Sequence, residues 1–376
     1  MLVMENRKIR VLHFSIANTK SGVTQYIMNH WQFIDRSKFH FDFATFSRKL
    51  DDEERIIREG SRVYHIGTYA EADEEKFCDE VSGILKNNYD IVHLHTSNWS
   101  SVLLERLARE AHIPKIIIHS HNSDVHNSYG KSREEAVEKH LWMREGLTED
   151  LATDYWACSW RAADWLYGDR IPKEKIAIMK NAIDVDRFLF DQLLREQHRK
   201  AFGLDGSFVI GHIGRFEYQK NHEFLIKVFA GLKDEISNAR LVLIGDGSLW
   251  RNMEEMIEEY DLEDQVLLCG KQAEIEKWYQ AMDVFALPSW FEGLPLSLIE
   301  AQTADLPCLV SEHVSKEVEI SDHCHFLRLD EELWRLELKK IYRKGKRERC
   351  NMKQIISRAG YDLESEIKVL EKMYLQ

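Results

Sequence analysis

The feature that most constrains the fold of this chain is a repeated alternation of short apolar segments and amphipathic segments. The apolar segments are rich in Val, Ile, Leu and Phe, which is typical of buried strands, and segments with helical periodicity follow most of them. Such alternation predicts parallel sheets with helices on both faces. We expect strands at 8–14, 40–46, 62–66, 90–94, 115–118, 154–159 and 175–179, and again at 208–213, 240–244, 265–268, 284–287 and 308–311.

The length fits two domains of this kind. The chain has 376 residues, and single domains span roughly 100–200 residues. Residues 186–203 are highly charged and predict a surface helix, so we place the boundary just before them. The sequence therefore predicts two similar-sized, doubly wound α/β domains, 1–185 and 186–360, that face a central cleft.

Composition narrows the classes of partner. A formal net charge of -13 argues against nucleic acid as the main partner. No window approaches the ~20 apolar residues that span a bilayer, and the start of the chain lacks the apolar region of a signal peptide. The six cysteines are scattered without CxxC spacing, which favours thiols in a reducing compartment. We therefore expect a cytoplasmic protein, either soluble or peripheral to a membrane.

Two carboxylates are predicted to gather where the segment 287–310 turns from strand to helix. Glu292 lies in the loop and Glu300 about one turn into the helix, beside the first helical amides, those of Leu296 and Ser297. A helix N-terminus favours anions, and carboxylates accept hydrogen bonds from hydroxyls, so the set suits a sugar nucleotide. The alternative is that both glutamates only favour the helix dipole.

Polar residues also follow two expected strands of the first half. His95 follows the strand at 90–94, and His119, His121 and Asn122 follow the next strand. Ligands of open α/β sheets bind beyond the carboxyl ends of the strands, so these side chains could face one binding site. A solitary histidine is more often a structural residue, but three at two strand ends favour function.

Cations and a glycine occupy other loops at strand ends. Arg215 and Lys220 flank the loop after 208–213 and together could neutralise a diphosphate, although each alone reads as a surface cation. Gly22, in the first loop, would let a ligand approach the backbone closely, although taken alone it is more typical of a plain tight turn. Lys271 follows the strand at 265–268, where a nucleotide base could bind.

Four motifs carry a resemblance to a known family: IIIHSHN (116–122), GRFEYQKNH (214–222), LVLIGDG (241–247) and MDVFALPSWFEGLPLSLIEAQ (282–302). With them, the chain resembles the retaining glycosyltransferases of family 4, which have the GT-B fold. It looks most similar to the bacterial branch that builds exopolysaccharide and capsular repeat units. The resemblance runs nearly end to end.

The resemblance implies a role for each residue of the C-terminal, donor-binding domain. Arg215 and Lys220 would bind the donor's diphosphate and stabilise it as it leaves, with the amides near Leu296 and Ser297. Glu300 would hold the ribose hydroxyls, and Glu292 hydroxyls of the donor sugar. Lys271 would complete the donor site.

It also implies roles in the N-terminal, acceptor-binding domain. Gly22 would lie against the diphosphate, and His121 near the reacting sugar as a catalytic residue. His95, His119 and Asn122 would line the acceptor site. The last helix, 361–376, would cross back to pack on this domain.

The implied reaction transfers a hexosyl unit with retention of configuration from a nucleotide-sugar, usually a UDP-sugar. The acceptor would be a saccharide or a polyprenyl-diphosphate-linked saccharide at the inner face of the cell membrane. No cofactor or metal is expected, because the cations and the helix end would replace it. Two alternatives remain: a sugar-nucleotide epimerase of the same fold, and an inactive scaffold subunit of a polysaccharide assembly complex.

Overall fold

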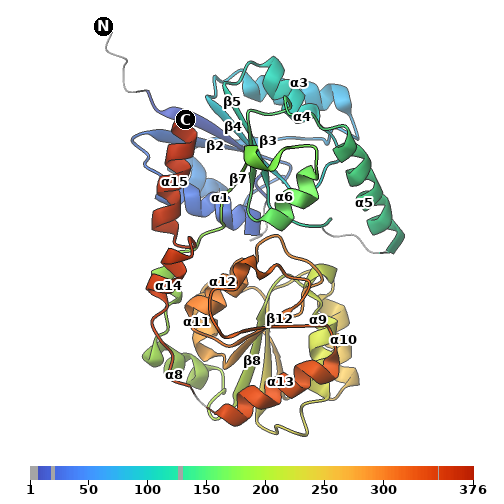
Figure 1. The fold of residues 1–376 in the computed structure, drawn as a ribbon, viewed down its shortest axis with the longest axis vertical. Helices are drawn as coiled ribbons and strands as arrows, with labels where there is room; N and C mark the ends of the chain where they lie inside the picture. Colours follow the sequence, from blue (N-terminus) through green and yellow to red (C-terminus); the bar gives the residue numbers. More distant parts are fainter. Residues whose placement is uncertain (1–6, 18–21, 126–129, 346) are drawn as a thin grey trace. The chain divides into compact units, whose positions relative to one another are not determined.

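The computed structural model describes residues 7–17, 22–125, 130–345 and 347–376 (Figure 1). Contacts divide the chain into two compact units. Unit 1 contains the described residues up to 125, residues 130–182 and the C-terminal segment 363–376, and unit 2 contains residues 183–362. Residues 183–185 and 361–362, which we expected in the N-terminal domain, lie in unit 2. There the Ile183 amide donates to the Tyr361 carbonyl (3.0 Å), and Ile183 pairs with Asp362.

Unit 1 is built on a seven-stranded parallel sheet in the order β3-β2-β1-β4-β5-β6-β7. Its strands are β1 (Ile9–Phe14), β2 (Phe39–Thr45), β3 (Val63–His65), β4 (Ile91–Thr96), β5 (Lys115–Ser120), β6 (Asp154–Ala157) and β7 (Ile176–Ile178). Its helices are α1 (Gly22–Phe33), α2 (Glu53–Arg58), α3 (Glu74–Leu85), α4 (Leu103–Glu110), α5 (Gly130–Glu145), α6 (Trp160–Tyr167) and α15 (Leu363–Leu375), with the 3₁₀ turn Lys173–Lys175. The strand order reverses between β1 and β4, where open α/β sheets bind ligands.

Unit 2 has a six-stranded parallel sheet in the order β10-β9-β8-β11-β12-β13, which reverses between β8 and β11. Its strands are β8 (Phe208–Ile213), β9 (Ala239–Ile244), β10 (Val266–Leu268), β11 (Val284–Leu287), β12 (Cys308–Ser311) and β13 (Cys324–Leu327). Its helices are α7 (Val185–Phe188), α8 (Gln192–Ala201), α9 (His222–Ala230), α10 (Trp250–Glu259), α11 (Ile275–Ala281), α12 (Leu296–Thr303), α13 (Glu331–Lys344) and α14 (Lys353–Arg358), with 3₁₀ turns Tyr218–Lys220 and Lys316–Val318.

The predicted fold class is confirmed, since both sheets are parallel and each reverses its order once. Every strand expected from the sequence is present, but β13 and α13 were not among the expectations. α13 carries a readable signal. The Asp330 side chain accepts from the Leu333 amide (2.9 Å), Gly345 follows the last turn, and Trp334 and Leu338 are buried four residues apart. This is the capping and spacing of an ordinary amphipathic helix.

The last helix returns to unit 1, as the resemblance implied. α15 packs on α1 (Figure 1). It adds three side chains, Ile367, Leu370 and Tyr374, to the core that α1 forms with β1 and β2. The buried His30 on α1 also pairs with Glu366 on α15. This packing joins the far end of the chain to the first β-α unit.

The sequence also predicted free thiols and no membrane-spanning segment, and the described residues bear on both. The six cysteines form no disulfide among them. Within the same residues, no helix combines the length and apolar character that crossing a bilayer would require.

Leu370→Ala should destabilise unit 1, because Leu370 has 0% exposure in the core. Removing such a side chain costs about 2–5 kcal/mol. Denaturant unfolding would measure this loss of unfolding free energy. The adjacent Val369 is 50% exposed, so Val369→Ala should cost less than about 0.5 kcal/mol. Equal losses in the two variants would contradict the packing of α15 described here.

Candidate functional site

A buried ion pair lies where the sheet of unit 2 reverses its order. Lys220 ends the 3₁₀ turn after β8, and Glu292 lies in the loop between β11 and α12. Lys220 Nζ donates to Glu292 Oε1 at 2.6 Å, and the two side chains are 14% and 6% exposed. Gln219 Nε2 donates to the other carboxylate oxygen, Oε2, at 3.2 Å. The carboxylate is therefore held on both oxygens, and removing either charge would leave its partner buried and uncompensated.

Glycines set the path of the loop that carries Lys220. A Cβ atom on Gly214 would lie 2.9 Å from His212 Nε2 and 3.1 Å from the Lys220 stem, so a side chain there would displace the lysine. Gly245 has φ +138°, and a Cβ atom on it would lie 2.0 Å from the Gly214 carbonyl oxygen. The turn 245–247 thus supports the Lys220 loop through contacts that only glycine permits.

Glu300 lies on α12 and is 7% exposed. The Tyr279 hydroxyl donates to its Oε2 at 2.7 Å. Burial raises the pKa of Glu300 to about 7, although the Tyr279 hydrogen bond and the charges of Arg187 and Lys220 act in the opposite direction. The carboxyl group therefore changes charge near neutral pH.

The N-terminus of α12 lies beside these carboxylates. The helix begins at Leu296, and its N-cap residue, Pro295, makes no side-chain hydrogen bond to it. The first amides of a helix lack partners within the helix, so those of Leu296 and Ser297 can receive an anion. Leu296 is buried and Ser297 is partly buried. We therefore expect their backbone amides, rather than their side chains, to bind the anion.

The two other cations that the sequence predicted for the site, Arg215 and Lys271, differ in their surroundings. Arg215 is partly buried in the loop after β8, next to Gly214, on which the stem of Lys220 packs. Lys271 is exposed at the carboxyl end of β10 and pairs with Asp246 at 3.0 Å. An exposed pair of this kind contributes little to stability. Lys271 lies two strands away from the reversal between β8 and β11.

The predicted histidines of unit 1 lie together. His95 Nδ1 lies 2.8 Å from His121 Nε2, and the rings of His119 and His121 are 4.0 Å apart between centroids. One detail of the prediction is wrong: β4 and β5 extend two residues beyond the expected ends, so His95 and His119 lie within strands. The expected ends followed the apolar runs, whereas the ladder continues through Thr96 and Ser120. Asn122 is buried and donates to the Asp124 carbonyl at 2.7 Å.

Sequence reasoning missed two members of this group, His13 and His93. His13 Nδ1 lies 2.9 Å from His95 Nε2, and His93 Nε2 lies 3.1 Å from His119 Nδ1. Burial lowers the pKa of all five rings, to about 3 for His13 and His121, so the imidazoles are neutral at pH 7. The signal for His93 was its spacing of two residues from His95, which places both on one face of a strand.

Gly22 is the first residue of α1 and is exposed. Among the described residues, a Cβ atom on it would meet nothing within 4 Å. The loop residues 18–21 before it lie outside the described residues.

Comparison with known families assigns both halves of the chain. Residues 20–187 match the model described as "Glycosyltransferase Family 4", and residues 195–328 match the one described as "Glycosyl transferases group 1". The first lies almost wholly in unit 1 and the second in unit 2.

Individual relatives agree with this assignment. The chain is 29% identical to EpsF of Bacillus subtilis (strain 168), which carries a provisional glycosyltransferase name, over 99% of this chain and 97% of that protein. It is 26% identical, over 81% of this chain and 79% of the other, to an Escherichia coli UDP-Gal:alpha-D-GlcNAc-diphosphoundecaprenol alpha-1,3-galactosyltransferase.

Among solved structures, the fold is similar to that of Anabaena Alr3699/HepE in complex with UDP and glucose. The TM-score is 0.77 with 14% identity, over 97% of this chain and 99% of that one. Two parallel-sheet units, two matching family models and relatives along the whole chain lead to one conclusion: the chain belongs to glycosyltransferase family 4 and has the GT-B fold.

Proposed function

We propose that this glycosyltransferase transfers a hexosyl unit, with retention of configuration, from a UDP-sugar to a polyprenyl-diphosphate-linked saccharide. The product would extend a cell-surface polysaccharide such as an exopolysaccharide or a capsule. The observation that carries the proposal is the buried Lys220–Glu292 pair beside the uncapped N-terminus of α12. The names of relatives support the substrates: one uses UDP-Gal and a diphosphoundecaprenol-linked acceptor, and a structural neighbour binds UDP and glucose.

Unit 2 offers a separate group for each part of the donor. We assign the diphosphate to Lys220, Arg215 and the first amides of α12, because a diphosphate needs cations and N–H donors. The ribose hydroxyls would donate to Glu300. Lys271, farther along the sheet, is assigned to the nucleoside side of the donor.

Donor binding would rearrange the buried pair. A phosphate that takes the Lys220 ammonium leaves Glu292 Oε1 available to accept from hydroxyls of the donor sugar. Gln219 still donates to Oε2 and holds the carboxylate in place. The pair thus keeps two groups of opposite charge satisfied until the substrate supplies partners for both.

The reaction proposed at this site needs no protein nucleophile. The bond between the sugar C1 and the diphosphate oxygen breaks, and the negative charge on the diphosphate is stabilised by Lys220 and Arg215. The acceptor oxygen attacks from the same face and passes its proton to the departing phosphate. Because these cations and the α12 amides neutralise the diphosphate, we propose that transfer requires no metal.

Residues of unit 1 receive the acceptor-side roles. His121 has a buried Nδ1 without a hydrogen-bond partner, which makes it the residue we assign to the reacting sugar. His95 is partly exposed and can meet the acceptor. His119 and Asn122 are 0% and 2% exposed, so they would position His121 rather than touch a substrate. Gly22 keeps the role of admitting the diphosphate.

A lipid-linked acceptor would bring the enzyme to the inner face of the cytoplasmic membrane. Trp142 on α5 is 74% exposed, with Leu141 beside it at 37%. An exposed Trp is suited to the headgroup region of a bilayer. We assign α5 as the contact with the membrane surface.

Without added metal, UDP or one UDP-sugar should raise the melting temperature of the purified chain. A ligand at 100 times its Kd stabilises the native state by about 2.7 kcal/mol. A panel of nucleoside diphosphates and nucleotide-sugars, followed by thermal unfolding, measures this. Arg215→Ala should lose the shift, whereas Arg251→Ala, an 87% exposed side chain on α10, should keep it. A wild-type protein that responds to no nucleotide would favour the scaffold alternative.

Glu292→Gln should lower kcat/KM for sugar transfer by at least 100-fold. The glutamine side chain lacks the negative charge that faces Lys220, and it accepts hydrogen bonds from sugar hydroxyls less strongly than a carboxylate does. The folded state should weaken by about 3–5 kcal/mol if Lys220 is left without a counter-ion, so turnover must be measured below the variant's melting temperature. Glu223→Gln, whose carboxylate pairs with Lys227 at the surface of α9, is the control and should transfer normally. Near-normal transfer by Glu292→Gln would remove Glu292 from the site.

Affinity for the UDP-sugar should rise several-fold between about pH 6 and pH 8, because the raised pKa of Glu300 is about 7 and only its ionised form accepts from both ribose hydroxyls. A UDP-sugar has no phosphate group that titrates in this range. Calorimetric titration at each pH measures the affinity. Glu300→Gln should bind more weakly and with a flat pH profile. Parallel profiles for the two proteins would show that Glu300 does not contact the donor.

A further inference from the structure

Five histidines of unit 1 lie on one face of its sheet, where the strand order reverses. They are His13 on β1, His93 and His95 on β4, His119 on β5, and His121 just after β5. Parallel pairing sets His13 opposite His93, and His95 opposite His119. Residues two apart on a strand share a face, so His93 lies on the same face as His95, and His119 on the same face as His121. Strand pairing and this spacing together place all five rings on one face of the sheet. We call this group the histidine cluster.

The rings contact one another and the helices that cover them. One chain of contacts runs from His13 through His95 to His121, at 2.9 and 2.8 Å. A second runs from the Tyr374 hydroxyl on α15 through His93 to His119, at 2.7 and 3.1 Å. The cluster is therefore connected on both sides, through neutral imidazoles that each offer one N–H and one lone pair.

These contacts do not use all the polar atoms of the cluster. Three buried ring nitrogens have no hydrogen-bond partner among the described residues: His13 Nε2, His119 Nε2 and His121 Nδ1. The hydroxyl of Tyr26, whose ring lies 5.2 Å from that of His119, is also buried without one. Each such group costs about 1–3 kcal/mol. Five imidazoles buried at this cost are unusual in a purely structural core, although these four atoms are not the ones that would bind the metal proposed below.

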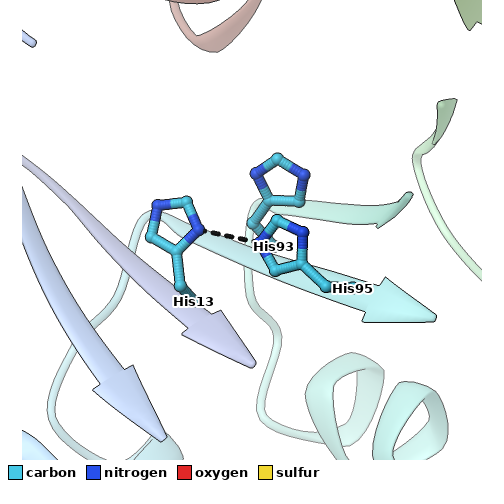
Figure 2. A group of neighbouring side chains, drawn as sticks. All are labelled: His13, His93 and His95. Carbon is cyan, nitrogen blue, oxygen red and sulfur yellow. Dashed lines mark hydrogen bonds between the residues drawn. The ribbon is translucent and has the colours of Figure 1, made fainter. Parts of the chain in front are cut away.

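The ring nitrogens converge as metal ligands do. In His13, His93 and His95, one nitrogen of each ring lies within 4.8 Å of one on each of the others, and Figure 2 shows the three rings beside one another, with a hydrogen bond joining His13 and His95. His95, His119 and His121 form a second such group. His95 belongs to both.

We propose that the histidine cluster binds one divalent transition-metal ion, of which Zn²⁺ is the probe, through His13, His93 and His95. The group His13, His93 and His95 is favoured because its outer contacts match those of metal-bound histidines. With His93 and His95 binding through Nε2, the Nδ1 of His93 stays on the Tyr374 hydroxyl and that of His95 stays on His121. Such outer hydrogen bonds fix the tautomer and ring orientation of metal ligands.

Binding through His93 Nε2 would replace the contact of that atom with His119 Nδ1, and the rest of the adjustment is small. Two ligands at about 2.0–2.1 Å from a tetrahedral Zn²⁺ lie about 3.3 Å apart, and His13 Nδ1 and His95 Nε2 lie 2.9 Å apart. The two rings need to separate by only a few tenths of an ångström. His95 is partly exposed, so the ion has a route from solvent. The buried Glu366 on α15, whose Oε1 has no partner, places a carboxylate on the same side of the sheet as the cluster.

The ligand type defines which metals compete. Imidazole nitrogens suit Zn²⁺, Cu²⁺, Ni²⁺ and Co²⁺, whereas Mg²⁺ and Ca²⁺ prefer oxygen ligands. The proposed ion is therefore a transition metal held by nitrogen ligands, unlike Mg²⁺, which would bind to the oxygen atoms of a diphosphate. The metal-free diphosphate site proposed for unit 2 and the metal site proposed for unit 1 do not depend on each other.

The test uses the full-length chain with any affinity tag removed and with metal stripped by a chelator. Zn²⁺ is added to the protein, and calorimetry and elemental analysis give affinity and stoichiometry. Co²⁺ is added in parallel as a spectroscopic probe. We expect one ion per chain, a raised melting temperature, and the intense visible absorption of tetrahedral Co²⁺.

Variants locate the site. His95→Asn and His13→Asn should each lower Zn²⁺ affinity at least 100-fold, and Tyr374→Phe should lower it about 10-fold because all ligands remain. His323→Asn, a partly exposed histidine of unit 2, is the control and should bind as the wild type does. Circular dichroism and thermal unfolding check that each variant folds.

Three results would overturn the proposal. The first is wild-type protein with no stoichiometric Zn²⁺ or no tetrahedral Co²⁺ spectrum, a result that needs no variant to fold. The second is unchanged affinity in folded His95→Asn. The third is a loss of affinity in His121→Asn of the size expected for a ligand while His13→Asn binds normally, which would contradict the assigned ligands.

Discussion

The candidate site of unit 2 depends on one buried ion pair, Lys220 with Glu292. Neither group can be buried alone, because an uncompensated charge in a protein interior costs several kcal/mol. The loops that carry them must therefore meet. Gly214 and Gly245 support the Lys220 side of the pair, because their missing side chains let the loop after β8 pack closely on the turn 245–247. The pair also keeps a cation and a carboxylate ready beside the N-terminus of α12. It links the stability of the unit to its proposed chemistry.

The two units use the same topological solution with different side chains. In each, the sheet reverses its strand order once, which leaves the loops on either side of the reversal free to hold functional groups. Unit 2 places Lys220 after β8 and Glu292 after β11. Unit 1 places His13 near the end of β1 and His95 near the end of β4. The fold thus explains where the groups lie, and their side chains are the basis of the two proposals: a site for anions and hydroxyls in unit 2, and a metal site in unit 1.

The sequence could predict much of this because local patterns determine it. Apolar runs located the strands of both sheets except β13, and the spacing of Glu292 and Glu300 around a helix start identified the carboxylates of unit 2. It could not show that Lys220 and Glu292 pair directly, because they come from different strand-helix units and meet only through the sheet. His13 and His93 were missed for the same reason: strand register, which brings His13 opposite His93, is a property of the assembled sheet. The roles of the site residues were predicted from the resemblance to a known family as well as from the residues themselves. The comparisons with known proteins establish the family, and the roles of the residues stay predictions.

The central claim is that the donor diphosphate binds where Lys220 meets Glu292, and a crystal structure with the UDP-sugar bound would test it most directly. The account predicts that Lys220 Nζ leaves Glu292 and lies about 3 Å from a phosphate oxygen, that Arg215 and the first amides of α12 contact the same diphosphate, and that Glu292 accepts from a sugar hydroxyl. A bound donor whose phosphates lie elsewhere, with the Lys220–Glu292 hydrogen bond intact, would contradict it.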